Sequence, residues 1–363
     1  MSKHTSIVVI SHNRPNYVDK FCKLLNIQKF HGTLIICDSS VQKNFLKTSK
    51  LIENKKKFNF KIKHYQITKK KGDKVSYSMN DSYAKGLKNI RTKYFIMTCD
   101  DDIPSVKAIN LFEKFLSNSN YEACIGDLAW HSKEKTSKNI FFRLIKKIPF
   151  FRVGAFSMQR FGIVKGYSLV EKFPMDRIEK YFSVDKRFHP LFTFQRKNVA
   201  KYIINKKHRK ISFNHLSADY HWMLSIILSS RIYYIPVTHI HRFFHGKNLS
   251  IKNNQHPHPS IFQGIISSNW SRDLNNFFNS LKNISCQYSG RKLNEKNRDQ
   301  FLNYYLLGML KGNRNLNKKI TSTFQRRLEK VKLYFYNFKY IFNFNKDYCE
   351  YSFFQESFYK KKN

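Results

Sequence analysis

The stretch KYFIMTCDDDIPS, from Lys93 to Ser105, decides the fold class of this chain. Its first seven residues form an apolar run typical of a buried strand, and the run ends in three consecutive carboxylates, Asp100, Asp101 and Asp102. In doubly wound α/β proteins, ligands bind outside the carboxyl ends of the parallel strands. If this strand belongs to such a sheet, the three carboxylates lie where a ligand binds.

The residues around this stretch predict a doubly wound α/β unit over 1–130. Short apolar runs predict strands at 6–11, 32–40 and 93–99, and an alternating polar and apolar pattern predicts one at 58–67. Helical spacing of apolar residues predicts helices at 16–26, 77–90 and 106–116. Strands that alternate with helices in this way build a mostly parallel sheet.

The second half of the chain is less regular. A helix is predicted at 217–230 and a strand with a polar exit at 231–246, and the polar segment 248–260, rich in Pro and His, is interpreted as a linker. The sequence therefore predicts an α/β domain at 1–250, with halves at 1–130 and 131–250. A helical, basic and aromatic C-terminal region follows at 260–363.

The composition indicates an anionic partner. The 363 residues contain 67 Lys and Arg against 24 Asp and Glu, a net charge of +43, while 41% apolar residues indicate a globular chain. The six cysteines are scattered without a C-x-x-C pair, which favours reduced thiols in the cytoplasm. Neither a signal peptide nor a membrane span is predicted, so we expect a soluble or peripheral protein.

Two interpretations of the three carboxylates are open. Adjacent carboxylates repel one another unless a cation neutralises them, and Mg²⁺ or Mn²⁺ bound by one or two carboxylates keeps positions open for phosphate oxygens. The alternative is a solvated acidic turn that caps the following helix, whose positive dipole end favours Asp. No P-loop or dinucleotide fingerprint occurs elsewhere in the sequence.

Three motifs in order give the chain a family resemblance. SIVVISHNRPNYVDKFCKLL, LIICDSS and RTKYFIMTCDDDIPS, within about 5–130, resemble the opening of GT-A glycosyltransferases, in the family-two-like group with three consecutive Asp. The resemblance implies a GT-A fold and a metal-dependent transfer of sugar from a nucleotide sugar to a hydroxyl group. It also implies a donor-binding half at 1–130, an acceptor half at 131–250 and Mn²⁺ or Mg²⁺ as cofactor.

The resemblance assigns roles to individual residues. It implies donor-binding roles for Ser11, Asn13, Arg14, Asp38, Lys74, Asp100 and Asp101. Asp102 is expected to bind the metal directly, with Asp100 and His241 as further ligands; His239 and His245 are the other histidine candidates. Asp38 is alternatively a turn-forming residue, and each of these histidines is alternatively a core or surface residue.

Inverting enzymes of this fold need a general base that deprotonates the acceptor hydroxyl. Asp219, at the start of the helix predicted at 217–230, matches that role, with Asp127 as the competing candidate. The alternative for Asp219 is an ordinary acidic residue that stabilises the helix dipole.

The basic aromatic segments at 138–152 and 323–344 fit an anionic membrane surface, a core-packing stripe with a solvated face, or nucleic acid. No RNA- or DNA-binding motif is present, so a specific nucleic-acid partner is not expected. The resemblance implies a glycan or lipid-linked acceptor of surface polysaccharide biosynthesis, used in the cytoplasm at the inner face of the membrane. The rival functions are a nucleic-acid-processing protein and a non-catalytic partner in glycan assembly.

Overall fold

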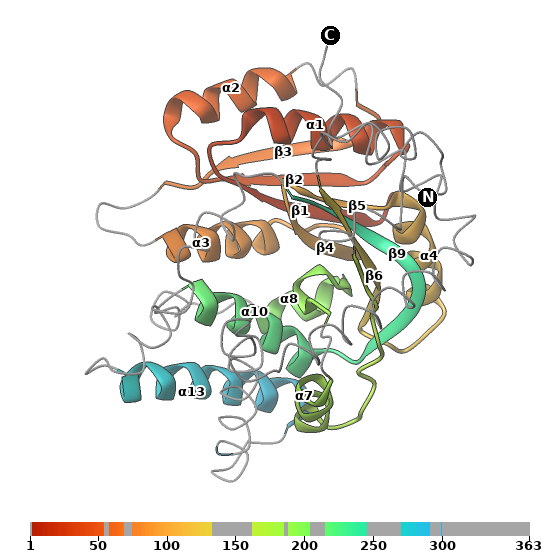
Figure 1. Cartoon of the computed structure of the whole chain (residues 1–363), viewed down its shortest axis with the longest axis vertical. Helices are drawn as coiled ribbons and strands as arrows, with labels where there is room; N and C mark the ends of the chain where they lie inside the picture. The colour runs from red at the N-terminus through yellow and green to blue at the C-terminus, as the bar shows by residue number, and fades with distance from the viewer. Residues whose placement is uncertain are drawn as a thin grey trace, which may run out of the picture.

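The described residues form a mixed sheet of nine strands with helices on both faces (Figure 1). The computed structural model describes residues 2–53, 58–68, 75–132, 162–184, 188–203, 215–244, 270–290 and 299. The strands are β1 (Thr5–Ser11), β2 (Thr33–Asp38), β3 (Lys61–Gln66), β4 (Tyr94–Cys99), β5 (Asp102–Pro104), β6 (Ala123–Ser132), β7 (Gly162–Val164), β8 (Phe194–Arg196) and β9 (Ile232–Phe244). The helices are α1 (Pro15–Ile27), α2 (Gln42–Glu53), α3 (Val75–Lys88), α4 (Val106–Ser117), α7 (Pro174–Ser183), α8 (Ala200–Ile203), α10 (His215–Ser229) and α13 (Trp270–Ser289).

The strand order explains why three loops meet at one edge of the sheet. The order is β3-β2-β1-β4-β8-β6-β9-β5, with β7 beside β6, and the first four strands run parallel. Beyond β4 the sheet is mixed, since β8 is antiparallel to β4 and β6 while β6 and β9 are parallel. Because β1 lies between β2 and β4, the loops after these three strands are neighbours. The α/β class is confirmed, and the parallel part of the sheet is its N-terminal half.

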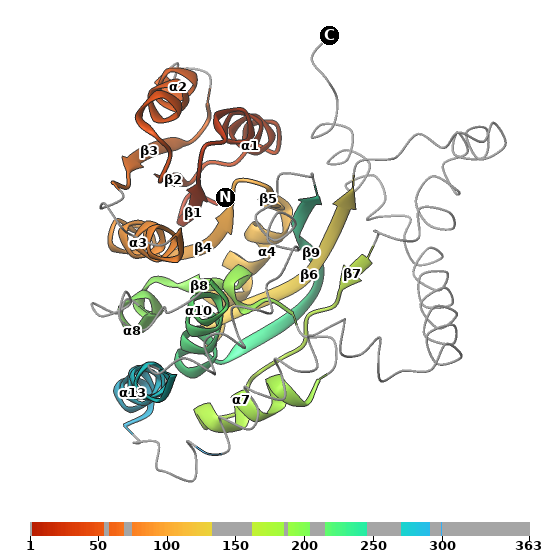
Figure 2. The same ribbon diagram turned by 60° about the vertical axis from the view of Figure 1, so that its left-hand side comes forward.

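Helices lie on both faces of the sheet (Figure 2), and an apolar layer holds them on each face. One layer joins α1, α2 and α4 to one face through residues such as Phe21, Ile52 and Phe112. The other joins α3, α7, α8, α10 and α13 to the opposite face, with Tyr83 and Trp222 among its residues. The sequences of β1, β2 and β4 are continuous apolar runs because both faces of the sheet are covered at these strands.

Helix α13 is part of this core. Phe277, Leu281 and Ile284 are buried at helical spacing, and His221 of α10 shares a 2.9 Å hydrogen bond with Ser280. The expected helical C-terminal region is therefore helical at α13, whose apolar stripe packs against protein. The segments 138–152 and 323–344 lie outside the described residues, as does the domain boundary expected between 250 and 260. In the part of the chain that the structure describes, no helix has the length and apolarity that a membrane span requires.

A buried arginine caps the C-terminal end of α10. The fully buried guanidinium of Arg177 donates to the carbonyl oxygens of Ile227 (2.7 Å) and Leu228 (2.8 Å), and also to those of Glu171 and Lys172. The last carbonyl groups of a helix have no partner within the helix, and a cation at this end also interacts favourably with the helix dipole. Arg177 thus fixes α10 relative to α7.

Candidate functional site

The carboxylate triplet is buried at the turn between β4 and β5. Asp100, Asp101 and Asp102 expose only 2%, 7% and 0% of their surface, so this is not a solvated turn. Helix α4 is capped by Ser105, whose hydroxyl oxygen accepts a hydrogen bond from the backbone N–H of Ala108. The helix-capping interpretation of the triplet is therefore wrong, because Ser105 caps the helix and Asp102 already belongs to strand β5, which ends before the helix begins.

Asp100 connects the end of β4 to the end of β1. The Ser11 hydroxyl donates to Asp100 Oδ2 at 2.7 Å, and Arg14 Nη1 lies 3.1 Å from Asp100 Oδ1 and 2.9 Å from Asp101 Oδ2. Burial and the charge of Asp101 raise the pKa of Asp100 to about 7, against the opposing effects of Arg14 and Ser11. The structure thus brings together four residues expected at the donor site.

Asp102 is the least compensated carboxylate of the three. Its partner in the β5–β9 ladder is Arg242, whose Nε lies 3.4 Å from Asp102 Oδ1. Neither carboxylate oxygen accepts a hydrogen bond from the described residues, although both are buried. Burial raises the pKa of Asp102 to about 7, with Arg242 opposing the shift and Asp101 adding to it. A buried carboxylate with vacant acceptor positions fits a cation site.

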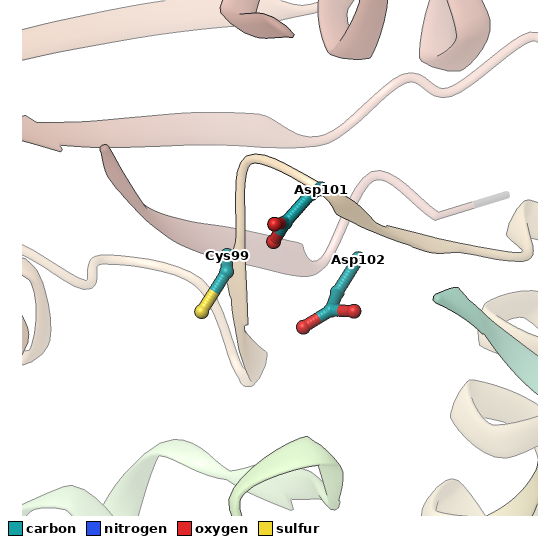
Figure 3. Close-up of side chains that lie close together, drawn as sticks. All are labelled: Cys99, Asp101 and Asp102. Carbon is teal, nitrogen blue, oxygen red and sulfur yellow. The ribbon is translucent and has the colours of Figure 1, made fainter. Parts of the chain in front are cut away.

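Besides the carboxylates, a cysteine near Asp102 is a candidate metal ligand. Ligand atoms of Cys99, Asp101 and Asp102 lie within 4.8 Å of one another, and Figure 3 shows these side chains close together around the β4–β5 turn. The Tyr83 hydroxyl lies 3.7 Å from Cys99 Sγ. Burial and the charges of Asp102 and Asp101 raise the pKa of the Cys99 thiol well above its usual value. These donors fit a divalent cation with carboxylate ligands and one sulfur neighbour.

The loop after β2 forms the next part of the rim. Asp38 is fully buried, and its Oδ1 accepts hydrogen bonds from the backbone N–H (2.9 Å) and the hydroxyl of Ser40, while His64 lies 3.4 Å from Oδ2. Burial alone would raise the pKa of Asp38, but the bonds from His64 and Ser40 outweigh it and lower the pKa. The turn-forming role of Asp38 is therefore present in the structure, and its donor contact stays a prediction.

Asn13 joins the loops after β1 and β2. Its backbone has a φ of 56°, in the left-handed region that Asn tolerates better than most residues. The Asn13 backbone N–H donates to Ser40 Oγ at 2.6 Å, and its side-chain oxygen accepts from the Val41 N–H and from Asn44, each at 3.0 Å. The Asn13 side chain, which was expected to contact the donor, thus holds the loops after β1 and β2 together.

The carboxylate expected to act as general base, Asp219, lies on helix α10. Its side chain lies outside the described residues, as does Lys74. Asp219 precedes Trp222 by three positions, so the two positions share one face of α10. The Trp222 ring packs against Tyr83, and the Trp222 indole N–H donates to Asn80 of α3. Tyr83 in turn contacts Cys99. This chain of contacts connects the base candidate's helix to the triplet.

Asp127, the competing base candidate, has structural partners. Its Oδ1 accepts hydrogen bonds from the Gly166 N–H at 3.1 Å and from the Tyr234 hydroxyl at 3.0 Å. These bonds attach the segment after β7 and strand β9 to β6, which favours a structural role.

The expected histidines lie on β9 or beyond it. His241 Nδ1 lies 2.9 Å from His131 Nε2, and His241 pairs with Ile103, next to the Asp102–Arg242 pair in the ladder. Neighbouring strand residues point to opposite faces, so His241 and Asp102 face different sides. Both ring nitrogens of His239 face backbone carbonyl oxygens, of Asp127 and Phe192, and His245 lies outside the described residues. His241 as a metal ligand stays a prediction.

Similarity to known proteins is found among solved structures and not at the level of sequence. No protein-family model matches the chain, and no curated protein matches it in sequence. Among solved structures, S. aureus TarS 1–349 in complex with UDP-GlcNAc is similar at 13% identity and a TM-score of 0.48, over 91% of this chain and 79% of that one. The complex of TarS 1–349 with UDP is similar at 11% identity and a TM-score of 0.40, over 94% and 91%. A likeness at this level assigns no function, which has to be inferred from the site.

Proposed function

We propose that this chain is a metal-dependent glycosyltransferase that moves a sugar from a nucleotide-sugar donor to a hydroxyl group of a glycan or lipid-linked acceptor. The observation that supports it is that three strand ends meet around one buried acidic site. The bonds of Asp100 to Ser11 and Arg14 join the ends of β4 and β1, and those of Asn13 to Ser40 and Val41 join the loops after β1 and β2. The resemblance of the sequence motifs concerns the same three strand ends. The vacant acceptor positions of Asp102 add a place for a cation.

The donor would bind across the ends of β1, β2 and β4. Asp38 and Asn13 are held in place by bonds within the rim, so the nucleoside would meet a preformed surface there. Arg14 and Arg242 place two guanidinium groups beside the carboxylates, where they can also meet phosphate oxygens. Lys74 would add a further cation on the diphosphate side.

Asp102 and Asp100 are the ligands proposed for Mn²⁺ or Mg²⁺, with the fit resting on Asp102. When bound, such an ion supplies positive charge that stabilises the leaving diphosphate. Asp219 would take the proton of the acceptor hydroxyl as the acceptor oxygen bonds to the sugar carbon and the bond to the diphosphate breaks. Attack on the side opposite the leaving group inverts the configuration at that carbon.

The acceptor side of the proposal rests on charge and resemblance. A net charge of +43 attracts an anionic surface, so we place the enzyme in the cytoplasm at the inner face of a membrane, where it would build surface polysaccharide. Two rival functions make different predictions. A nucleic-acid-processing protein would use the same positive charge to bind phosphate groups of nucleic acid. A non-catalytic partner in glycan assembly would keep the fold but bind no nucleoside diphosphate.

Turnover of sugar nucleotides tests the proposed function. The full chain is incubated with Mn²⁺ and a panel that includes UDP-GlcNAc and GDP, dTDP and CMP sugars, and release of the nucleotide product is measured. We expect release from one donor in the wild type, and its loss in Asp102→Asn and Asp219→Asn. Asp19→Asn, whose carboxylate pairs with Lys23 on the exposed side of α1, should retain activity. Release of nucleotide that is equal in all four proteins would contradict the proposal.

A further inference from the structure

The Cys99 thiol is the one sulfur atom among the ligand candidates at the β4–β5 turn in the described part of the chain. Cys99 ends β4, and its Sγ belongs to the group whose ligand atoms all lie within 4.8 Å of one another, together with carboxylate oxygens of Asp101 and Asp102 (Figure 3). Ligands of a single ion are separated by distances of this order, since metal–sulfur and metal–oxygen bonds measure about 2.0–2.3 Å. Small side-chain adjustments would bring the three atoms around one ion.

A second observation concerns the partners of Asp102 within this group. Asp102 is fully buried, its oxygens accept no hydrogen bond from the described residues, and its ion pair with Arg242 is 3.4 Å long. A buried carboxylate is stable when it is paired or bound to a metal, and this ion pair leaves acceptor positions of Asp102 vacant.

The tyrosine beside Cys99 is placed to support a bound thiolate. The Tyr83 hydroxyl lies 3.7 Å from Cys99 Sγ, and the Tyr83 ring is fully buried against Trp222, 5.6 Å between ring centroids. Once the sulfur is a thiolate, the hydroxyl donates to it and holds its orientation. Such supporting bonds orient the ligands of metal sites and tune their affinity.

We infer that the cation site is a mixed sulfur and oxygen site in which Cys99 is a direct ligand, so that it binds borderline ions such as Co²⁺ or Zn²⁺ in preference to Mg²⁺. Thiolate ligands select Zn²⁺ and similar ions, whereas Mg²⁺ requires oxygen ligands and retains its water. On coordination the S–H proton leaves to solvent and the sulfur electron pair forms the bond to the metal, without oxidation or reduction. The inference rests on the cation site of the proposed function, and not on sugar transfer.

The test is a titration of the full chain with Co²⁺, followed by near-ultraviolet absorption, which reports a cobalt–thiolate bond directly. Wild type is compared with Cys99→Ser and with the matched control Cys286→Ser, which removes another partly exposed thiol, on α13. We expect the absorption band in wild type and in Cys286→Ser, and no band in Cys99→Ser. Calorimetry should show that Cys99→Ser binds Co²⁺ at least tenfold more weakly than wild type, because loss of a residue that only supports a metal ligand already lowers affinity by about tenfold. Wild type should also release about one more proton per ion than Cys99→Ser.

A measurement on wild type alone avoids dependence on how Cys99→Ser folds. Alkylation of each cysteine is followed by mass spectrometry without metal, with Mg²⁺ and with Zn²⁺. Zn²⁺ should slow the labelling of Cys99 and not that of Cys286, and Mg²⁺ should protect neither.

Two results would overturn the inference. A band that persists in Cys99→Ser places the thiolate elsewhere, and Co²⁺ binding without a band in wild type shows an all-oxygen site. Either result leaves the proposed sugar transfer intact, provided that a nucleotide sugar is still consumed. Conversely, a Cys99-dependent band in a protein that consumes no sugar nucleotide supports the mixed site and contradicts the proposed function.

Discussion

Asp102 and Arg242 face each other in the antiparallel ladder of β5 and β9, with 3.4 Å between Arg242 Nε and Asp102 Oδ1. Arg242 also lies over the rings of Trp130 and Phe192, 5.8 and 5.9 Å from their centroids, so it is held in place from its other side. The positive charge that faces Asp102 in the metal-free protein is therefore positioned by aromatic packing. A cation bound at Asp102 would take over part of that role.

Arg242→Met should destabilise the metal-free protein and increase its response to Mn²⁺. Removing one partner of a buried pair leaves the other uncompensated, so we expect a loss of up to about 3 kcal/mol in the free energy of unfolding at pH 8. Urea unfolding with and without Mn²⁺ measures both effects. Arg231→Met is the control, because Arg231 pairs with Glu122 elsewhere and its loss should not alter the Mn²⁺ response. Equal Mn²⁺ stabilisation in the Arg242 and Arg231 variants would count against a cation at Asp102.

The stability of the metal-free protein should depend on pH through Asp102. Burial raises the pKa of Asp102 from 3.8 to about 7, so between these pH values the folded protein holds a proton that the unfolded chain has lost. The contribution of Asp102 to stability is therefore present at low pH and is lost as pH rises towards 7, by about 1.4 kcal/mol per pH unit at most.

The difference between wild type and Asp102→Asn isolates this effect. Burial lowers the pKa of His189 to about 3 and of His239 to about 4, and these neutral histidines destabilise the folded state as pH falls below 6.5 in both proteins. Melting curves from pH 8 to pH 5 should show that Asp102→Asn loses the contribution of Asp102 to the response that favours low pH, while the contribution of Asp100, whose pKa is also raised to about 7, remains. Parallel curves for the two proteins would refute the assignment.

Arg177→Met should be among the most destabilising single changes in the described chain. It leaves carbonyl groups at the end of α10 without donors and removes a buried cation, with an expected cost of about 3 kcal/mol. Arg177→Lys should recover little, because one ammonium group cannot reproduce the planar fork of the guanidinium. Urea unfolding gives both values, and full recovery by lysine would argue against the bonding described here.

Asn13 offers a test that separates backbone from side chain. Asn13→Ala loses three side-chain bonds and strains a residue with a φ of 56°, whereas Asn13→Gly loses the same bonds without strain. We expect Ala to be less stable than Gly by about 1 kcal/mol. Thermal unfolding of the two variants measures it, and an equal loss in both would mean that strain at this position is negligible.

The N-terminal half of the fold was predictable because β1, β2 and β4 are continuous apolar runs and β3 alternates between polar and apolar residues. The strands predicted at 6–11, 32–40, 58–67 and 93–99 correspond to β1, β2, β3 and β4, and the three helices predicted between and after them correspond to α1, α3 and α4. Helix α2 was missed since it buries only Thr48 and Ile52, which leaves little apolar periodicity to read. Strand β5 was missed because three residues are too few for a pattern.

The candidate site was predictable at its strand ends and not across the sheet. Ser11, Arg14 and Asp100 meet because parallel strands end at one edge, a rule that depends only on local sequence. The pairing of Asp102 with Arg242 depends on the register between strands 140 positions apart, which periodicity does not set. Cys99 was not recognised as a ligand candidate, because a single cysteine at a strand end resembles an ordinary core residue.

Donor binding tests the central claim most directly. Thermal shift of the full chain with UDP, GDP, dTDP and CMP sugars, each with and without Mn²⁺, is compared between wild type and Asp102→Asn. We predict that one nucleotide class raises the melting temperature of the wild type when Mn²⁺ is present, and that the shift disappears without the ion or without the Asp102 carboxylate. No shift from any nucleotide, or a shift that is the same in Asp102→Asn, would contradict a nucleotide-sugar site at the β4–β5 turn.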